Sequence, residues 1–154
     1  MIVEPDLILT DLVATSKKHL LSQVSKSIAQ YLESSDCTCV SVLDAMLERE
    51  KIGSTAIGEG VAIPHIRLSC LDRCVTAFVR LKTPIKFDAV DGRDVDLIYV
   101  FLAPENPETR TGALMHLARI SHFFRDLEFC DMLRVSDEPM DLIRFRNNEM
   151  LEAA

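Results

Sequence analysis

The sequence predicts an α/β fold: a single-domain α/β/α sandwich in which helices flank both faces of a mixed β-sheet. Three observations lead to this prediction. Leu97–Leu102 is apolar without alternation, which is typical of a central strand covered on both faces. Residues 74–81 alternate in the manner of a second strand. Apolar residues at three- and four-residue spacing lie before and after these strands and predict helices.

The first third of the chain predicts one strand and two helices. Residues 8–14 are expected to form a short strand or a turn that closes the sheet edge. Ser16 can cap a helix with one apolar face, which we expect to end near residues 34–36. A second helix is expected over residues 38–51, and Gly53 ends it.

The rest of the chain alternates between strands and turns and then becomes helical. Val61–Ile63 predicts a short buried strand that stops at Pro64, because proline cannot donate a ladder hydrogen bond. The strand that begins at Cys74 is expected to break at Thr83–Pro84. A loop over 104–112 is followed by segments with helical spacing near 114–124, 129–135 and 140–145, and by a frayed end over 149–154.

Length and charge restrict the class of protein. A chain of 154 residues fits one domain, which we place over residues 1–154 with a core at about 8–147. The net charge of −7 disfavours nucleic acid and anionic membranes as partners. The longest apolar run, Leu97–Ala103, is too short to cross a bilayer, and residues 1–6 carry no export signal. We therefore expect a cytoplasmic protein with no membrane insertion.

The cysteines and acidic residues do not have the spacing of a metal site. Five cysteines without a secretory signal favour free thiols. The pairs Cys37/Cys39 and Cys70/Cys74 do not match zinc-ribbon spacing. The aspartates of residues 88–94 lack the terminal glutamate of an EF-hand. The sequence thus predicts no metal and no cofactor.

One stretch, residues 53–65, combines small and hydroxylated residues with a single histidine. Its glycines allow tight turns that offer N–H groups to an anion, and Ser54 and Thr55 add hydroxyl donors. His65 follows the predicted strand end at Pro64, so we expect it to face a loop. Arg67 favours an anionic ligand over a metal. These residue types suit a phosphoryl group on the imidazole nitrogen.

Two motifs carry a family resemblance. Residues 49–55, REKIGST, followed by Gly60–His65, GVAIPH, resemble the nitrogen-regulatory type of enzyme IIA of the bacterial phosphoenolpyruvate phosphotransferase system. The resemblance covers nearly the whole chain and continues through 81–104 into 114–126. It implies that His65 accepts a phosphoryl group from a small histidine phosphocarrier.

The resemblance also implies the groups around the phosphate. The expected supporting residues are Arg49, Ser54, Thr55, Gly60 and Arg67. Relatives usually carry a second histidine where this chain has Ala113, so this helper is replaced. His116, one helical turn further on, could substitute for it if the helix is shifted.

The resemblance implies a phosphohistidine-relay protein that regulates others. Its expected partners are a phosphocarrier of the HPr or NPr kind, which a phosphoenolpyruvate-dependent enzyme I phosphorylates, and regulated kinases or transporters. Two alternatives stay open. One is a protein-binding regulator that is not phosphorylated, and the other is a fructose- or mannitol-type IIA subunit that delivers phosphate to a separate sugar permease.

Overall fold

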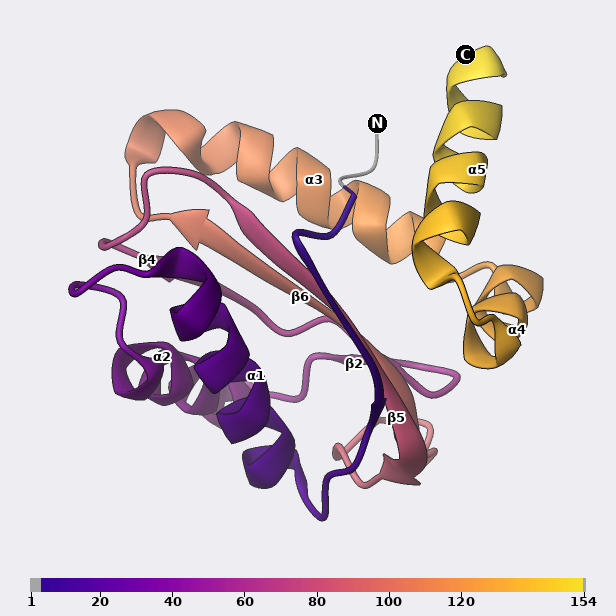
Figure 1. Cartoon of the computed structure of the whole chain (residues 1–154), viewed down its shortest axis with the longest axis horizontal. Helices are drawn as coiled ribbons and strands as arrows, with labels where there is room; N and C mark the ends of the chain where they lie inside the picture. The colour runs from indigo at the N-terminus through magenta and orange to yellow at the C-terminus, as the bar shows by residue number, and fades with distance from the viewer. Residues whose placement is uncertain (1–3, 154) are drawn as a thin grey trace.

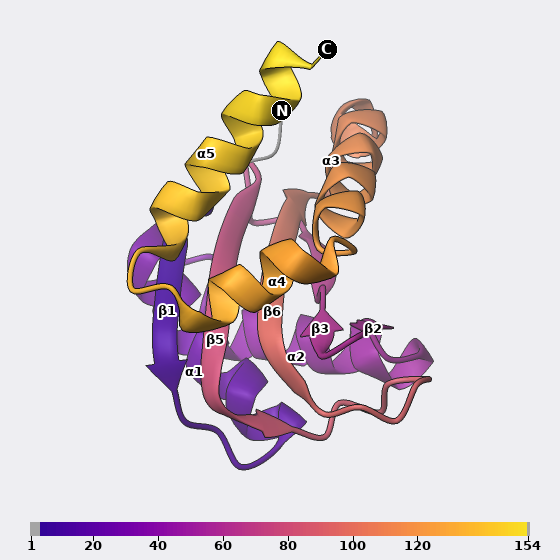
Figure 2. The ribbon, with the colours of Figure 1, turned by 90° about the vertical axis from the view of Figure 1, so that its right-hand side faces the viewer.

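The computed structural model describes residues 4–153. The strands are β1 (Leu7–Leu12), β2 (Ala56–Gly58), β3 (Val61–Ala62), β4 (His65–Leu68), β5 (Val75–Ile85) and β6 (Val95–Pro104). The helices are α1 (Lys17–Leu32), α2 (Cys39–Ile52), α3 (Arg110–Phe123), α4 (Leu127–Val135) and α5 (Pro139–Glu152), with a 3-10 turn η1 (Pro107–Thr109). Helices α1 and α2 cover one face of the sheet, and α3, α4 and α5 lie on the other (Figures 1 and 2).

The sheet is mixed, as predicted, and β6 lies at its centre. Its order is β1-β5-β6-β3-β2, and β4 pairs with β6 beyond the end of β3. β1 is parallel to β5, and β3 and β4 are parallel to β6, whereas β5 is antiparallel to β6 and β2 to β3. This confirms the predicted fold class. The single-domain boundaries 1–154 stay a prediction.

Side chains fix where several helices begin. Ser16 accepts a hydrogen bond from the N–H of His19, and Thr38 accepts one from Ser41. Each bond satisfies a backbone donor that the first helical turn leaves unpaired. In the described part of the chain, no helix has both the length and the apolar character needed to cross a membrane.

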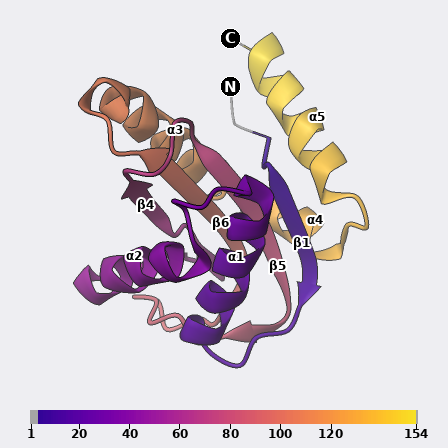
Figure 3. The ribbon, with the colours of Figure 1, turned by 60° about the vertical axis from the view of Figure 1, so that its left-hand side comes forward.

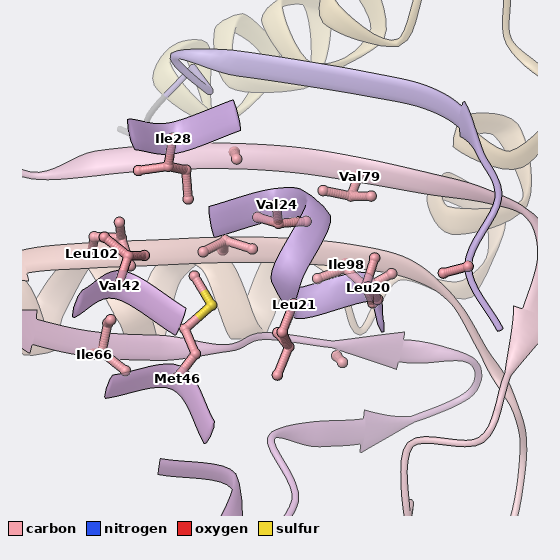
Figure 4. Close-up of a cluster of buried hydrophobic side chains, with 14 of the residues drawn as sticks. Leu20, Leu21, Val24, Ile28, Val42, Met46, Ile66, Val79, Ile98 and Leu102 are labelled. Atoms are coloured by element: carbon pink, nitrogen blue, oxygen red, sulfur yellow. The ribbon is translucent and has the colours of Figure 1, made fainter. Parts of the chain in front are cut away.

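The core has two halves, one on each face of the sheet. Val75, Ala77 and Val79 of β5 pack towards α1 and α2, while Phe78 belongs to the half under α3 and α4. Figure 4 shows the first half, where Ile66 of β4 joins the side chains of the two helices. The alternation in the sequence thus predicts correctly which residues of β5 share a face.

His65 begins a further strand, β4, which corrects the expectation that it follows a strand end and faces a loop. β3 ends before Pro64, as predicted, but the carbonyl oxygen of Pro64 accepts a hydrogen bond from Phe101 N at 2.9 Å. β4 then begins at His65, in register with Phe101 of β6. A proline at a sheet edge removes one donor without ending the pairing, because its carbonyl still bonds the neighbouring strand.

Two other predicted ends are also wrong. β5 continues past Pro84 to Ile85, since the register with β6 shifts between Arg80 and Ile85 and the exposed proline falls in this irregular part. Helix α5 runs to Glu152, so residues 149–152 are helical and not frayed.

The cysteines are not all free, which corrects a further expectation. Cys37, before α2, and Cys70, after β4, form a disulfide with their Cα atoms 5.6 Å apart. The fold brings these two loops together although 33 residues separate them in sequence. Cys39, Cys74 and Cys130 are free.

Candidate functional site

The candidate site is a cavity of about 610 Å³ at the sheet edge formed by β4. Figure 3 shows β4 between α3 above it and α2 below it, and both helices contribute to the walls. From the sheet, the cavity is lined by His65, Ile66, Arg67, Phe101 and Ala103. His65 and Arg67 pair with Phe101 and Ala103 across the β4–β6 ladder, so these four side chains share one face.

Both helices present one face to the cavity. From α2 the lining residues are Ala45, Glu48, Arg49, Lys51 and Ile52, and from α3 they are Arg110, Ala113, Leu114 and Leu117. Apart from Lys51, each set follows the i, i+3, i+4, i+7 spacing of a single helical face. The cavity therefore joins the two helical layers around the edge of the sheet.

The His65 ring is half-buried and held in one orientation. Its Nδ1 lies 2.7 Å from the carbonyl oxygen of Ile63. A carbonyl oxygen only accepts, so Nδ1 carries the proton and donates. In the neutral ring the lone pair is then on Nε2, which has no hydrogen-bond partner among residues 4–153. The backbone thus selects the tautomer and leaves Nε2 available as a nucleophile.

Two arginines at the cavity, Arg49 and Arg67, are anchored by carbonyl oxygens rather than by carboxylates. Arg49 Nη1 donates to Gly53 O at 2.8 Å. Arg67 donates from Nε to Pro104 O at 3.3 Å and from Nη2 to Asn106 O at 3.0 Å. These bonds orient the guanidinium groups without neutralising them, so their positive charge remains available to an anion.

Two further cations at the cavity were not singled out from the sequence. The side chain of Arg110, at the start of α3, has no hydrogen-bond or ion-pair partner within the described residues. Lys51 Nζ lies 2.6 Å from Glu48 Oε1 in an exposed ion pair, and this carboxylate raises the pKa of Lys51. The sequence signal for Arg110 was weak, because it lies in a segment that we expected to be a loop.

Ser54 and Thr55 are not among the residues that line the cavity. Ser54 Oγ donates to Phe87 O at 2.5 Å. Buried Thr55 donates its hydroxyl to the Glu50 carboxylate, which also pairs with Lys17 at 3.0 Å. Both hydroxyl protons are therefore used to fasten the loop after α2.

Gly60 also lies away from the cavity lining, in the turn between β2 and β3. Its φ of +79° favours glycine. A Cβ at this position would lie 2.8 Å from Nη2 of Arg134 and 3.1 Å from Oδ1 of Asp96. The turn and this close approach explain the glycine without a ligand.

Ala113 and His116 differ in their relation to the cavity. Ala113 lines it and adds only a methyl group to the wall. His116 is not a lining residue; its ring centre lies 6.2 Å from that of Phe101, and its Nδ1 is buried without a partner within the described chain. Burial lowers the pKa of His116, and Arg119 lowers it further.

No group of three or more His, Cys, Asp or Glu side chains in residues 4–153 is placed to hold a metal ion. The site that the structure does provide is an oriented imidazole beside unneutralised cations at a sheet edge. This arrangement suits the covalent binding of an anion to a ring nitrogen.

Comparison with known proteins gives the class to which this fold and site belong. Residues 1–148 match the model of the family described as "Phosphoenolpyruvate-dependent sugar phosphotransferase system, EIIA 2". The chain belongs to this family.

Within the family, the chain is similar to the nitrogen-regulatory type. A nitrogen regulatory protein of Bradyrhizobium diazoefficiens is 39% identical over 137 residues, which cover 88% of this chain and 85% of the relative. One of Escherichia coli K12 is 39% identical over 128 residues, covering 82% and 76%. The crystal structure of nitrogen regulatory protein IIA-Ntr from Neisseria meningitidis matches with a TM-score of 0.77 and 33% identity, covering 88% of this chain and 91% of that one.

Proposed function

We propose that His65 is the phosphoryl acceptor of a phosphohistidine relay. The donor is a small histidine phosphocarrier of the HPr or NPr kind, which enzyme I phosphorylates with phosphoenolpyruvate. The phosphorylation state of His65 then regulates target proteins such as kinases or transporters. The observation that carries this proposal is the 2.7 Å hydrogen bond from His65 Nδ1 to Ile63 O, which leaves Nε2 as the reactive nitrogen.

In the proposed step, Nε2 of neutral His65 attacks the phosphorus of a phosphohistidine on the carrier. A P–N bond to Nε2 forms as the P–N bond to the carrier's ring breaks. The carrier's imidazole leaves with the electron pair of that bond and keeps its own N–H. His65 retains its Nδ1 proton, and the Ile63 carbonyl stabilises the positive charge that develops on the ring.

The cations at the cavity neutralise the transferred group. Arg49, Arg67 and Arg110 are proposed to hold the phosphoryl oxygens, since their charges are not paired with carboxylates in the described chain. Phosphorylation adds a charge of about −1.5 to −2 at this edge of the sheet. Such a change creates or removes a docking face for a regulated partner.

The remaining residues of the predicted site take indirect roles in this proposal. Ser54 and Thr55 fix the loop after α2 and so position Arg49, and Gly60 shapes the β2–β3 turn. His116 supports Phe101 and does not contact the phosphate. We place the protein in the cytoplasm, where phosphoenolpyruvate is available.

Labelling tests the proposal directly. The protein is incubated with radioactive phosphoenolpyruvate, enzyme I and the phosphocarrier, and acid-labile label on the chain is measured. We expect label on the wild type and on His122→Ala, an exposed histidine of α3, and none on His65→Ala. NMR of the phosphorylated ring should show the phosphoryl group on Nε2; attachment to Nδ1, or label that survives His65→Ala, would contradict the proposal.

The same experiment separates the alternatives. An intact protein that takes no label but binds a kinase or transporter is a regulator that works without phosphorylation. Label that passes on to the cytosolic domain of a sugar permease identifies a fructose- or mannitol-type subunit. Label that stays on His65 and changes the affinity for a regulated protein supports the nitrogen-regulatory role.

A further inference from the structure

We propose that the cavity beside His65 binds a small amphipathic carboxylate, with its carboxylate among the cations at the cavity and its apolar body against β6 and α3. The binding does not depend on phosphoryl transfer. It makes the same cavity a site at which a metabolite of this chemistry controls access to His65.

The apolar part of the cavity is larger than the phosphoryl group itself can use. Most of its lining side chains are apolar, and they come from α2, α3 and the sheet. Ile52 is 84% exposed and Leu114 is 59% exposed, although both lie beside this hollow. A phosphoryl group is small and fully polar, so it gains nothing from these walls. An apolar group that covers them gains free energy in proportion to the area that it removes from water.

The charged part of the cavity selects an anion. The whole chain has a net charge of −7, yet the cavity is lined by four cationic side chains and a single carboxylate, that of Glu48. This carboxylate is already paired with Lys51. Arg49 and Arg67 are held by carbonyl oxygens, so their charges are not cancelled. The local field is thus opposite in sign to the net charge of the protein.

The shape of the cavity suits a small molecule. Its volume of about 610 Å³ falls within the range of small-molecule sites, which are typically concave, largely apolar and equipped with few polar groups. Ala45 on α2 and Ala113 on α3 leave room between the helices because each contributes one methyl group. A molecule with one carboxylate and an aliphatic or aromatic group can place the carboxylate beside the cations and the apolar group against the apolar walls.

Octanoate serves as the probe and is titrated into the full-length unphosphorylated protein. Calorimetry measures the affinity, and NMR amide shifts locate the site. Octanamide is the matched neutral ligand, and acetate is the matched ligand without an apolar body. We expect saturable binding of octanoate at one site, with shifts centred on His65, Ala113 and Leu117. Octanamide should bind roughly two- to fivefold more weakly, as expected for loss of a partly exposed ion pair, and acetate should not saturate.

Matched variants separate the apolar and charged contributions. Ala113→Leu fills the cavity and should weaken octanoate binding at least tenfold, whereas Ala118→Leu, an exposed position on the same helix, should not change it. Ala45→Leu repeats the test from the α2 side. Arg110→Gln should weaken binding roughly two- to fivefold, and Arg119→Gln, exposed and outside the cavity, should leave it unchanged. Urea unfolding verifies that each variant is folded.

Three results would overturn the proposal. These are the absence of saturable octanoate binding, equal affinity for octanamide, and equal effects of Ala113→Leu and Ala118→Leu. Amide shifts at the cavity with the phosphocarrier but not with octanoate would likewise reject it, because the hollow would then be a protein-docking surface only. The labelling of His65 is measured separately, so a failed relay and a failed carboxylate site give different results. Where both hold, octanoate should slow the labelling.

Discussion

Replacement of Gly60 by alanine tests whether this glycine serves the fold or the phosphate. Gly60 has a φ of +79° and lies between β2 and β3, against the side chains of Arg134 and Asp96. Arg134 Nε donates to both carboxylate oxygens of Asp96, at 3.1 and 2.9 Å, and its Nη2 donates to Glu59 O at 2.8 Å. This cluster ties α4 to the start of β6, so a methyl group on Gly60 disturbs two elements.

Two effects determine the size of the loss. A left-handed backbone costs an L-residue about 1–2 kcal/mol. The new Cβ would lie 2.8 Å from Arg134 Nη2, so the guanidinium must move and give up its bond to Glu59 O. Loss of a partly exposed, charge-assisted hydrogen bond costs about 1–2 kcal/mol. We expect Gly60→Ala to lower the free energy of unfolding by about 2–4 kcal/mol.

The other glycines supply controls for each effect in urea unfolding. Gly92 has a φ of +72°, but no atom lies within 4 Å of the place that a Cβ would occupy, so Gly92→Ala should lose about 1–2 kcal/mol from the backbone alone. Gly53 is extended and open, and Gly53→Ala should change stability by less than about 0.5 kcal/mol. Gly112 lies within α3 in open space, so Gly112→Ala should stabilise the protein by roughly 0.5 kcal/mol.

Equal losses for Gly60→Ala and Gly92→Ala would refute the argument from the Arg134 contact. A Gly60→Ala protein of unchanged stability that no longer accepts label on His65 would refute the structural role itself. In that case Gly60 would contact the phosphate, as the family motif led us to expect.

Three further predictions concern the cysteines and His116. Cys37→Ser should lower the free energy of unfolding by about 3–4 kcal/mol, because the disulfide to Cys70, 33 positions away, restricts the unfolded chain. Reductant should cause the same loss in the wild type, whereas Cys39→Ser, at a free cysteine, should cause no such loss. Burial raises the pKa of Cys130 to about 11, so as pH rises the thiol ionises in the unfolded chain before it ionises in the folded protein. The free energy of unfolding should therefore fall between about pH 8.5 and pH 11, and Cys130→Ala should remove this dependence. His116 should titrate by NMR below its ordinary pKa of about 6.5, and His116→Gln should leave the labelling of His65 intact.

The sequence predicted the layers of the fold because burial on two faces has a clear pattern. The unbroken apolar run of β6 required cover on both sides, and Tyr99 and Val100 indeed belong to opposite halves of the core. Helical spacing and the cap Ser16 placed the start of α1, and spacing placed both ends of α2 within one residue; the end of α1, expected near 34–36, falls earlier, at Leu32. These signals depend only on residues close together in sequence, so they can be read without knowledge of the tertiary structure.

Two of the errors came from the prolines, because a strand, β4, begins directly after Pro64 and β5 continues past Pro84. Pro64 and Pro84 each lack a donor, and the expectation assumed that the ladder needs every N–H. Pro64 keeps the pairing through its carbonyl, and Pro84 lies where the register with β6 is already irregular. The consequence for the site is direct, since continued pairing after Pro64 places His65 in β4, in register with Phe101 of β6.

The hydroxyl residues show why sequence proximity misleads about a site. Ser54 and Thr55 lie close to His65 in the motif, yet their hydroxyls bond to Phe87 O and Glu50. Phe87 could not be foreseen as a partner, because that bond depends on how the loop after α2 packs against the segment before β6. Glu50 lies five residues before Thr55, and its bond depends on how the chain turns at the end of α2. A hydroxyl near a histidine in sequence is thus weak evidence for a shared ligand.

Arg110 shows the opposite case, a residue far from His65 in sequence that reaches the same cavity. The spacing of Arg110, Ala113 and Leu117 reveals one face of a helix, just as Ala45, Glu48 and Ile52 reveal a face of α2, but neither pattern shows that the two faces meet. They meet because β4 forms a sheet edge, so that each helical layer extends beyond the sheet there. The charge and the depth of the cavity therefore follow from the topology, and the histidine motif alone does not determine what the site can bind.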